Sequence, residues 1–165
     1  MGELASFPLF VPKPPLALTV TSWNQLNSLN TKVSEITIPS NSLNDASLTV
    51  LDLSRFRRLK KLVIGDECFM YVNETRLTGL YYLESVEIGK NSFTQHKNSF
   101  GQDSNRHSYL KDCPKLKSLK IGSYSFSDYG VLEIENVDAL EVIEIGEINF
   151  YYASLELKSI IIHRE

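Results

Sequence analysis

The chain has 165 residues, of which 42% are hydrophobic and 22% are charged, and its formal net charge is −3. This length and composition are those of one folded domain and exclude a disordered chain. The acidic balance argues against a general binder of nucleic acid or of anionic membranes, because neutralising phosphates requires an excess of Lys and Arg on one face.

Targeting signals and cysteine usage suggest the compartment. The sequence contains no apolar run of about 18 residues, so we expect no membrane span. Its first residues lack the basic start and apolar stretch of a secretory signal. The two cysteines, Cys68 and Cys113, are too few for a disulfide scaffold and are expected to be unpaired. These features favour the cytoplasm without fixing the compartment.

Residues 1–32 are predicted to form an extended segment followed by a capping helix. Residues 18–20 are a candidate strand, and residues 22–29 have the pattern of a short helix with Ser22 as N-cap. The helix carries three large apolar side chains, Trp23, Leu26 and Leu29. We expect them to cover the open end of the repeat array that follows.

Residues 33–165 are predicted to form that array. One phrase recurs four times, at spacings of 24, 33 and 24 residues: Leu59-x-x-Leu62-x-Ile64-Gly65-x-x-x-Phe69, Leu83-x-x-Val86-x-Ile88-Gly89-x-x-x-Phe93, Leu116-x-x-Leu119-x-Ile121-Gly122-x-x-x-Phe126 and Leu140-x-x-Ile143-x-Ile145-Gly146-x-x-x-Phe150. The alternating apolar positions predict a short strand, and the Gly is expected to permit a turn. The Phe is expected to stack on its counterparts along the core. Because one copy cannot bury its own apolar face, the copies must stack.

A second strand is predicted in each unit. Its inward residues lie two positions apart: Leu51 and Leu53, Thr75 and Leu77, Ser108 and Leu110, Leu132 and Ile134, Leu155 and Leu157. A degenerate copy of the phrase, with Val33, Ile36, Ile38 and Leu43 at the apolar positions, opens the array. We therefore expect about five coils and two parallel sheets.

The register also assigns the outward positions. Parallel strands bring equivalent residues of neighbouring units to about 4.8 Å from each other. Charges alternate in sign along three series: Lys60, Glu84, Lys117 and Glu141; Glu87, Lys120 and Glu144; Lys111, Glu135 and Lys158, with Asp52 beside Arg76. We expect a solvated sheet face whose charges compensate one another.

The same register separates the two cysteines. Cys113 stands where other units carry Phe56, Leu80 and Val137, so it is predicted to be buried. Cys68 stands where other units carry Ser92, Ser125 and Asn149. That position is interpreted as a turn, so Cys68 is predicted to be the more accessible thiol.

The 33-residue unit has nine extra residues, which we place in a loop at 95–107. Insertions in repeat proteins map to loops, and long loops often carry function. The candidate partner-binding residues are His96, Lys97, Phe100, Asp103, Arg106 and His107. Both histidines and Asp103 are potential metal ligands but lack a diagnostic spacing, so no metal is predicted, and a plain polar loop is the alternative.

No motif for catalysis or nucleic-acid binding is present. The basic run 55–61 could contact phosphates, but the register places Phe56 and Leu59 in the core, so no nucleic-acid partner is expected. The sequence has no Gly-rich phosphate loop, nucleophile elbow or His-Glu-x-x-His pattern. Its acids alternate with lysines instead of clustering. We expect a protein that is not an enzyme and uses no cofactor.

The last residues, 159–163, have the pattern of a strand with three apolar residues, Ile160, Ile161 and Ile162. An uncovered apolar edge strand is a template for pairing with another chain. Two interpretations stay open: the natural chain continues, or a second copy covers this edge in a homodimer.

The phrase Leu-x-x-Leu-x-Ile resembles the signature of the leucine-rich repeat superfamily. The continuation in 88–93 and 121–126, together with Cys113-x-x-Leu116, looks like the BspA-like branch. The repeat Asn of that family is matched only by Asn91. The resemblance covers residues 33–165 and implies a mainly β, right-handed parallel solenoid of about five coils with two strands each, here with a short N-terminal helical cap.

Members of that superfamily are mostly protein-interaction modules, and BspA-like members are often surface or adhesive proteins. The expected function is non-enzymatic binding of a protein partner through the solenoid sheet face and the inserted loop. The alternative is a structural or self-assembling fragment of a larger repeat protein that associates through its C-terminal edge strand.

Overall fold

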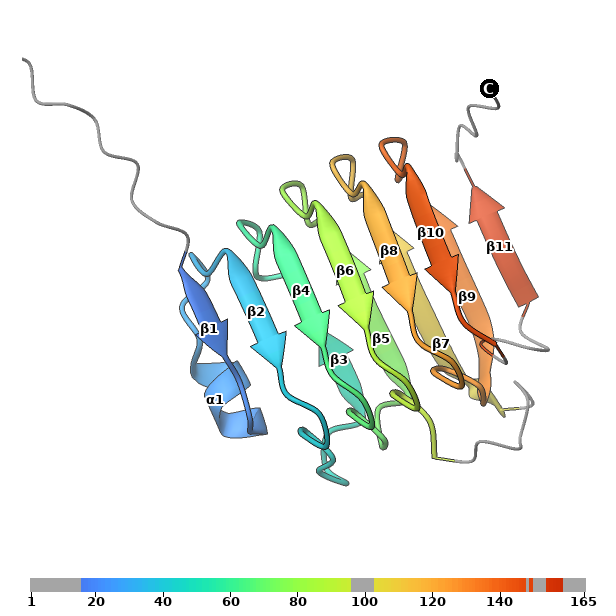
Figure 1. The fold of residues 1–165 in the computed structure, drawn as a ribbon, viewed down its shortest axis with the longest axis horizontal. Coiled ribbons are helices and arrows are strands. Elements are labelled where there is room, and N and C mark those ends of the chain that lie inside the picture. Colours follow the sequence, from blue (N-terminus) through green and yellow to red (C-terminus); the bar gives the residue numbers. More distant parts are fainter. Residues whose placement is uncertain (1–15, 96–102, 148, 150–153, 159–165) are drawn as a thin grey trace, which may run out of the picture.

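The computed structural model describes residues 16–95, 103–147 and 149, and the backbone of 154–158. These residues form two parallel sheets and one short helix, α1 (Trp23–Ser28), so the prediction of a mainly β fold with two parallel sheets is confirmed (Figure 1). The six-stranded sheet has the order β1 (Ala17–Thr19), β2 (Glu35–Ile38), β4 (Lys61–Ile64), β6 (Ser85–Ile88), β8 (Ser118–Ile121), β10 (Val142–Ile145). The five-stranded sheet has the order β11 (Ser154–Lys158), β9 (Tyr129–Glu135), β7 (Asp103–Lys111), β5 (Glu74–Thr78), β3 (Val50–Asp52).

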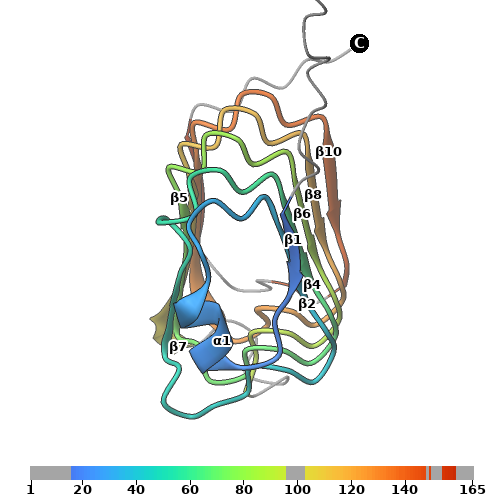
Figure 2. The ribbon, with the colours of Figure 1, turned by 90° about the vertical axis from the view of Figure 1, so that its left-hand side faces the viewer.

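From β2 onward the chain alternates between the two sheets, which face each other across the core (Figure 2). Each unit therefore contributes one strand to each sheet. Parallel pairing aligns equivalent residues, so that Leu62 lies beside Val86 and Val86 beside Leu119. The insertion enters between β6 and β7, and the register of the six-stranded sheet continues past it.

The inward side chains of both sheets form one continuous core. The inward residues predicted for the second strands are buried: Leu51, Leu53, Thr75, Leu77, Ser108, Leu110, Leu132 and Ile134. The predicted Phe stack is present, with ring centroids 4.9 Å apart for Phe69 and Phe93 and 4.5 Å apart for Phe93 and Phe126. Phe150 and the side chains of Leu155 and Leu157 lie outside the described residues.

The glycine that ends each phrase has a different role from the predicted turn. Among the described glycines, only Gly79 has a positive φ. A Cβ on Gly122 would lie 2.6 Å from the carbonyl carbon of Gly89 in the preceding unit. Glycine is needed because neighbouring units approach closely there. The left-handed backbone lies further on, at Asn91 and Phe93, both with a φ of 56°.

Cys68 is buried, so the prediction that it is the accessible thiol is wrong. Its Sγ lies 3.1 Å from the carbonyl oxygen of Pro39 in the preceding unit. Serines at the same register donate to the equivalent glycine carbonyl: Ser92 to Gly65 at 2.9 Å and Ser125 to Gly89 at 2.6 Å. The position faces inward because a small donor there satisfies a carbonyl that the strands leave unpaired.

Cys113 is buried as predicted, together with Phe56, Leu80 and Val137 at the same register. Burial raises the pKa of the Cys68 thiol, and it raises the pKa of the Cys113 thiol to about 11. Both cysteines are free. The two thiols therefore stay protonated at neutral pH.

Helix α1 covers one end of the core, as predicted. The Ser22 side chain accepts a hydrogen bond from the Gln25 amide at 3.2 Å, which caps the helix. Leu26 is buried, and Trp23 and Leu29 pack against the core. Strand β1 pairs with β2 and so extends the six-stranded sheet. Within the described ranges, no helix is long and apolar enough to cross a membrane.

Candidate functional site

The inserted segment begins after Gln95 and re-enters the sheet on β7. His96, Lys97 and Phe100 lie outside the described residues. The other three candidate residues, Asp103, Arg106 and His107, belong to β7 and not to a loop. The predicted loop 95–107 is therefore too long at its C-terminal end, because strand β7 begins at Asp103 and the alternation of Ser108 and Leu110 reaches back to Arg106.

Strand β7 is irregular where it starts. Asp103 pairs with Tyr129 and His107 with Val131, so four steps along β7 face two steps along β9. This bulge accommodates part of the insertion and redirects the side chains within it. Arg106 lies in the bulge, and its side chain points into the core.

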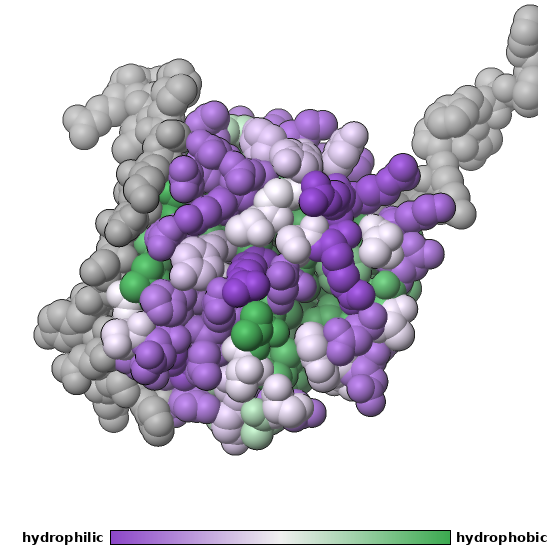
Figure 3. All heavy atoms as spheres, turned by 180° about the vertical axis from the view of Figure 1, so that it is seen from behind, coloured by the Kyte–Doolittle hydropathy of each residue, from purple (hydrophilic) through white to green (hydrophobic). Residues whose placement is uncertain are grey.

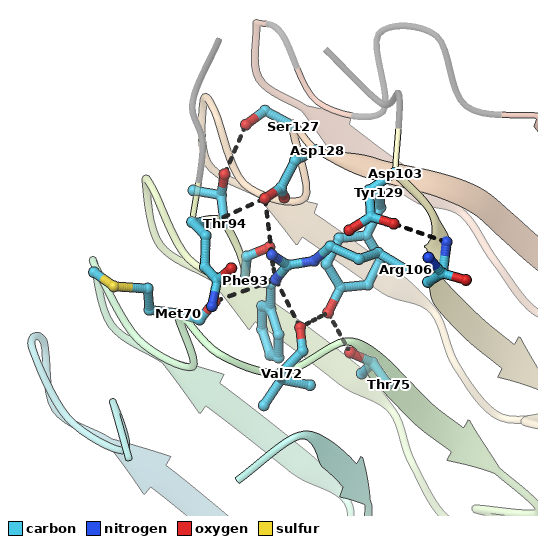
Figure 4. Close-up of polar contacts among 12 residues, drawn as sticks. Met70, Val72, Thr75, Phe93, Thr94, Asp103, Arg106, Ser127, Asp128 and Tyr129 are labelled. Atoms are coloured by element: carbon cyan, nitrogen blue, oxygen red, sulfur yellow. Dashed lines mark hydrogen bonds and ion pairs between the residues drawn. The ribbon is translucent and has the colours of Figure 1, made fainter. Parts of the chain in front are cut away.

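Arg106 is 1% exposed, so the prediction that it is an accessible contact residue is wrong. Its Nη1 lies 2.8 Å from Asp128 Oδ2, and both side chains are buried (Figure 4). Its Nη2 donates to three backbone carbonyls: Val72 at 2.7 Å, Met70 at 3.2 Å and Phe93 at 3.3 Å. The guanidinium thus bridges three successive units of the stack.

Asp128 connects the two ends of the inserted segment. Its Oδ2 accepts the Arg106 bond and also a hydrogen bond from the backbone amide of Gln95 at 3.0 Å. Next to it, the hydroxyls of Thr94 and Ser127 are 2.9 Å apart. One carboxylate oxygen therefore fastens both the start of the insertion and its return into β7. We call Gln95, Arg106 and Asp128 the insertion clasp.

Tyr129 packs against the clasp from β9. The Arg106 guanidinium carbon lies 4.8 Å from its ring centroid, which places a cation over an aromatic face. The Tyr129 hydroxyl donates to the Val72 carbonyl at 2.6 Å, and burial raises the Tyr129 pKa to about 12. The hydroxyl is a permanent donor at neutral pH.

Burial of the charged Arg106 and Asp128 side chains in the clasp has a cost in free energy. A buried ion pair loses its hydration, and the loss is offset only where further hydrogen bonds satisfy both partners. Three carbonyls around Arg106 and one amide on Asp128 supply such bonds. Removal of either charge would leave the other uncompensated, so the pair fixes Gln95 and Arg106, the described residues at the two ends of the insertion.

The sequence contained one overlooked signal for the clasp. Inward Ser108 and Leu110 imply by period two that Arg106 also faces inward. A buried Arg requires a carboxylate partner. The partner could not be named, because Asp128 stands 22 residues away with no motif around it.

Asp103 and His107 lie nearer the surface. Asp103 is exposed, and its Oδ1 accepts a hydrogen bond from the Asn105 amide at 2.9 Å. His107 is partly buried, with its ring 6.0 Å from Tyr109, and its Nδ1 has no hydrogen-bond partner among the described residues. Among those same residues, no group of three or more His, Cys, Asp and Glu is placed to hold a metal ion.

The outward faces of both sheets carry charges in the predicted register. Ion pairs link neighbouring strands: Arg76 to Asp52 at 3.7 Å, Lys111 to Glu133 and to Glu135, and Lys120 to Glu144 at 2.9 Å. Hydrophilic side chains dominate the face over the five-stranded sheet (Figure 3). These two faces are largely self-compensated.

The series Lys60, Glu84, Lys117 and Glu141 behaves differently. Their backbones are stacked, since each amide donates to the carbonyl of the equivalent residue in the preceding unit. Within the described part of the chain, their side chains form no ion pair within 4 Å. The predicted alternation of sign therefore does not produce a salt-bridge ladder here.

The basic run is partly used inside the fold. Phe56 and Leu59 are buried, as the register predicts. Arg55 donates to the Leu26 carbonyl at 2.6 Å and to the Asn27 carbonyl at 3.0 Å, at the C-terminal end of α1. Arg55 therefore fixes the helical cap instead of facing a ligand.

At the C-terminal end, the described residues contribute β10 to the six-stranded sheet and the backbone of β11 to the five-stranded sheet. Ile160, Ile161 and Ile162 lie outside the described residues. Among the described strands, β10 is the last of the six-stranded sheet, and it exposes three apolar side chains: Val142 by 39%, Ile143 by 51% and Ile145 by 45%. Leu119 and Ile121, which pair with the two isoleucines, are buried.

No family model, curated protein or solved structure matches the chain.

Proposed function

We propose that this chain is a leucine-rich-repeat-type solenoid that acts as a non-enzymatic protein-interaction module. The alternation of strands between two parallel sheets and the repeated phrase support this architecture. The proposed contact surfaces are the outward sheet face and the inserted segment.

The insertion clasp is the observation that carries the proposal. The two described ends of the inserted segment, at Gln95 and Arg106, meet at one buried carboxylate, which fixes both ends to the sheets. Binding segments placed on a rigid scaffold lose less conformational freedom when a partner binds. A buried Arg–Asp pair at this place serves positioning better than it serves stability.

Photo-crosslinking from chosen surface positions tests this proposal. A crosslinking amino acid replaces Ser104 beside the insertion, or Glu87 on the outward sheet face, and Asn24 on α1 serves as the control. All three residues are exposed. We expect adducts of one defined mass in cells from Ser104 and Glu87 and none from Asn24. Equal adducts from all three positions, or none from any, would remove the proposal.

A second function is favoured by the exposed apolar residues of β10. Edge strands present unpaired N–H and C=O groups, and an apolar edge invites pairing with another chain. We infer as the alternative a self-associating repeat fragment, including a homodimer, joined at this edge. Sedimentation over a range of protein concentrations distinguishes the two. A dimer dissociated by Ile143→Lys supports self-association, whereas a monomer at all concentrations excludes it.

A further inference from the structure

The turns that lead into the six-stranded sheet form a row at one corner of the molecule, just before β4, β6 and β8 (Figure 1). Each turn is closed by a backbone hydrogen bond: Leu59 to Phe56 at 2.8 Å, Leu83 to Leu80 at 3.0 Å and Leu116 to Cys113 at 3.1 Å. These flanking side chains are all buried. The two residues between them must therefore point outward in every turn.

Five of the six outward residues of these turns are basic or aromatic, and the sixth is Pro114. We call Arg57, Arg58, Tyr81, Tyr82 and Lys115 the corner ridge. Tyr81 is 47% exposed and Tyr82 is 48% exposed. Half-exposed tyrosines beside cations are typical of contact surfaces, where Tyr and Arg are enriched.

Neighbouring turns are in direct contact through these side chains. The guanidinium carbon of Arg57 lies 5.9 Å from the Tyr81 ring centroid. The Nζ of Lys115 lies 4.5 Å from the Tyr82 ring centroid. The corner ridge is thus one continuous surface across three units and not a set of separate side chains.

The cations of the corner ridge have no acidic partners in the described part of the chain. Of the residues the structure describes, none places a carboxylate oxygen within 4 Å of Arg57, Arg58 or Lys115. Lys60 and Lys117, in the adjacent column, are equally unpaired there. The acids nearest in register are Glu84, between Lys60 and Lys117, Glu141, on the other side of Lys117, and Asp138, in the next turn. The corner therefore keeps an excess of positive charge in a chain whose net charge is −3.

We propose that the corner ridge is a docking site for an extended acidic segment of a protein partner. This inference rests on the proposed interaction function and specifies the chemistry of the partner. Uncompensated positive charge steers and orients an acidic ligand. Three stacked turns cover about 10 Å, which an extended segment of roughly four residues spans.

The aromatic geometry favours an acidic peptide over single-stranded nucleic acid. Sequence-tolerant binding of bases requires an open aromatic face for stacking. Arg57 and Lys115 already lie over the rings of Tyr81 and Tyr82. A carboxylate can pair with these cations where they stand and accept a hydrogen bond from a tyrosine hydroxyl.

Fluorescence anisotropy with labelled octaglutamate tests the proposal, with a labelled twenty-residue oligothymidylate as the competing probe. The variant is Lys115→Glu. The matched control is Lys90→Glu, which changes the net charge equally at an exposed lysine outside the corner ridge. Thermal unfolding of both variants shows that each is folded.

We expect octaglutamate to bind the full chain more tightly than oligothymidylate. Lys115→Glu should weaken octaglutamate binding about fivefold or more, and Lys90→Glu less than about twofold, because local charge pairing dominates over net charge. Equal weakening by both variants, no binding of octaglutamate at low salt, or tighter binding of oligothymidylate would overturn the proposal. Crosslinking at Ser104 and Glu87 is independent of Lys115, so failure of the corner ridge and failure of the interaction module are distinguishable.

Discussion

Arg106 and the cations of the corner ridge represent two opposite uses of positive charge in one molecule. Arg106 is buried, paired with Asp128 and bonded to three carbonyls. Arg57 and Lys115 are exposed, lie over aromatic rings and form no ion pair among the described residues. The difference indicates that compensated charges position the chain, whereas uncompensated charges are available to a partner.

Substitution of Asp128 should have the largest effect, because it removes one half of the buried pair. We expect Asp128→Ala to lower the free energy of unfolding by about 3–5 kcal/mol, since Arg106 then remains buried without a counter-charge. Urea denaturation measures the loss. The double variant Arg106→Met/Asp128→Leu should recover most of it. A loss below about 1 kcal/mol in the single variant would show that the clasp is not a buried ion pair.

Alkaline pH should weaken the core at Cys113. The folded-state pKa of the Cys113 thiol, about 11, lies above the ordinary value. The stability that the protonated thiol gives the folded state is therefore fully present below about pH 9 and is lost as the pH rises toward 11. The expected loss is up to about 3 kcal/mol. Urea unfolding at pH 8 and pH 10.5 measures it. Cys113→Val, which copies Val137, should be less sensitive to pH, and an equal loss in both proteins would contradict this assignment.

Removal of the Ser92 hydroxyl should have an intermediate effect. This hydroxyl donates to the Gly65 carbonyl and accepts from the Cys68 amide at 3.1 Å, so Ser92→Ala leaves two groups unsatisfied. We expect a loss of about 1–3 kcal/mol by thermal unfolding. Ser104→Ala, at an exposed position, should be neutral. Equal stability of the two variants would argue against the inward hydrogen bonds of Ser92 to Gly65 and Cys68.

Neutralisation of Glu144 should have the smallest effect. Its pair with Lys120 is well exposed, and solvent and salt screen such pairs. We expect Glu144→Gln to leave the melting temperature unchanged within error at physiological salt. A clear drop in melting temperature that added salt does not reduce would show that the sheet-face ion pairs stabilise the fold. Exposed and buried pairs would then not differ as the comparison with Arg106 requires.

The repeat register accounts for most of what the sequence predicted correctly. It places Phe93, Cys113 and the inward pairs, because period two and stacking determine which side of a strand is buried. The role of Gly122 was mistaken, because a close approach between units depends on packing that no single unit reveals. Cys68 was misplaced for the same reason, since its partner is the Pro39 carbonyl of another unit.

The candidate site was predicted less well than the fold. The extra length of the 33-residue unit located the insertion. Arg106 was predicted to lie on the surface only because it is a charged residue in that polar insertion. Its burial depends on a carboxylate that the sequence gives no reason to pair with it. The corner ridge was also missed, because Arg57 and Tyr81 become neighbours only when units stack.

One measurement tests the central contrast directly: octaglutamate affinity and unfolding free energy determined together for Arg57→Glu. We expect the affinity for octaglutamate to fall about fivefold or more while the unfolding free energy is unchanged, because Arg57 forms no internal ion pair among the described residues. Unchanged affinity with a loss of stability would contradict this expectation.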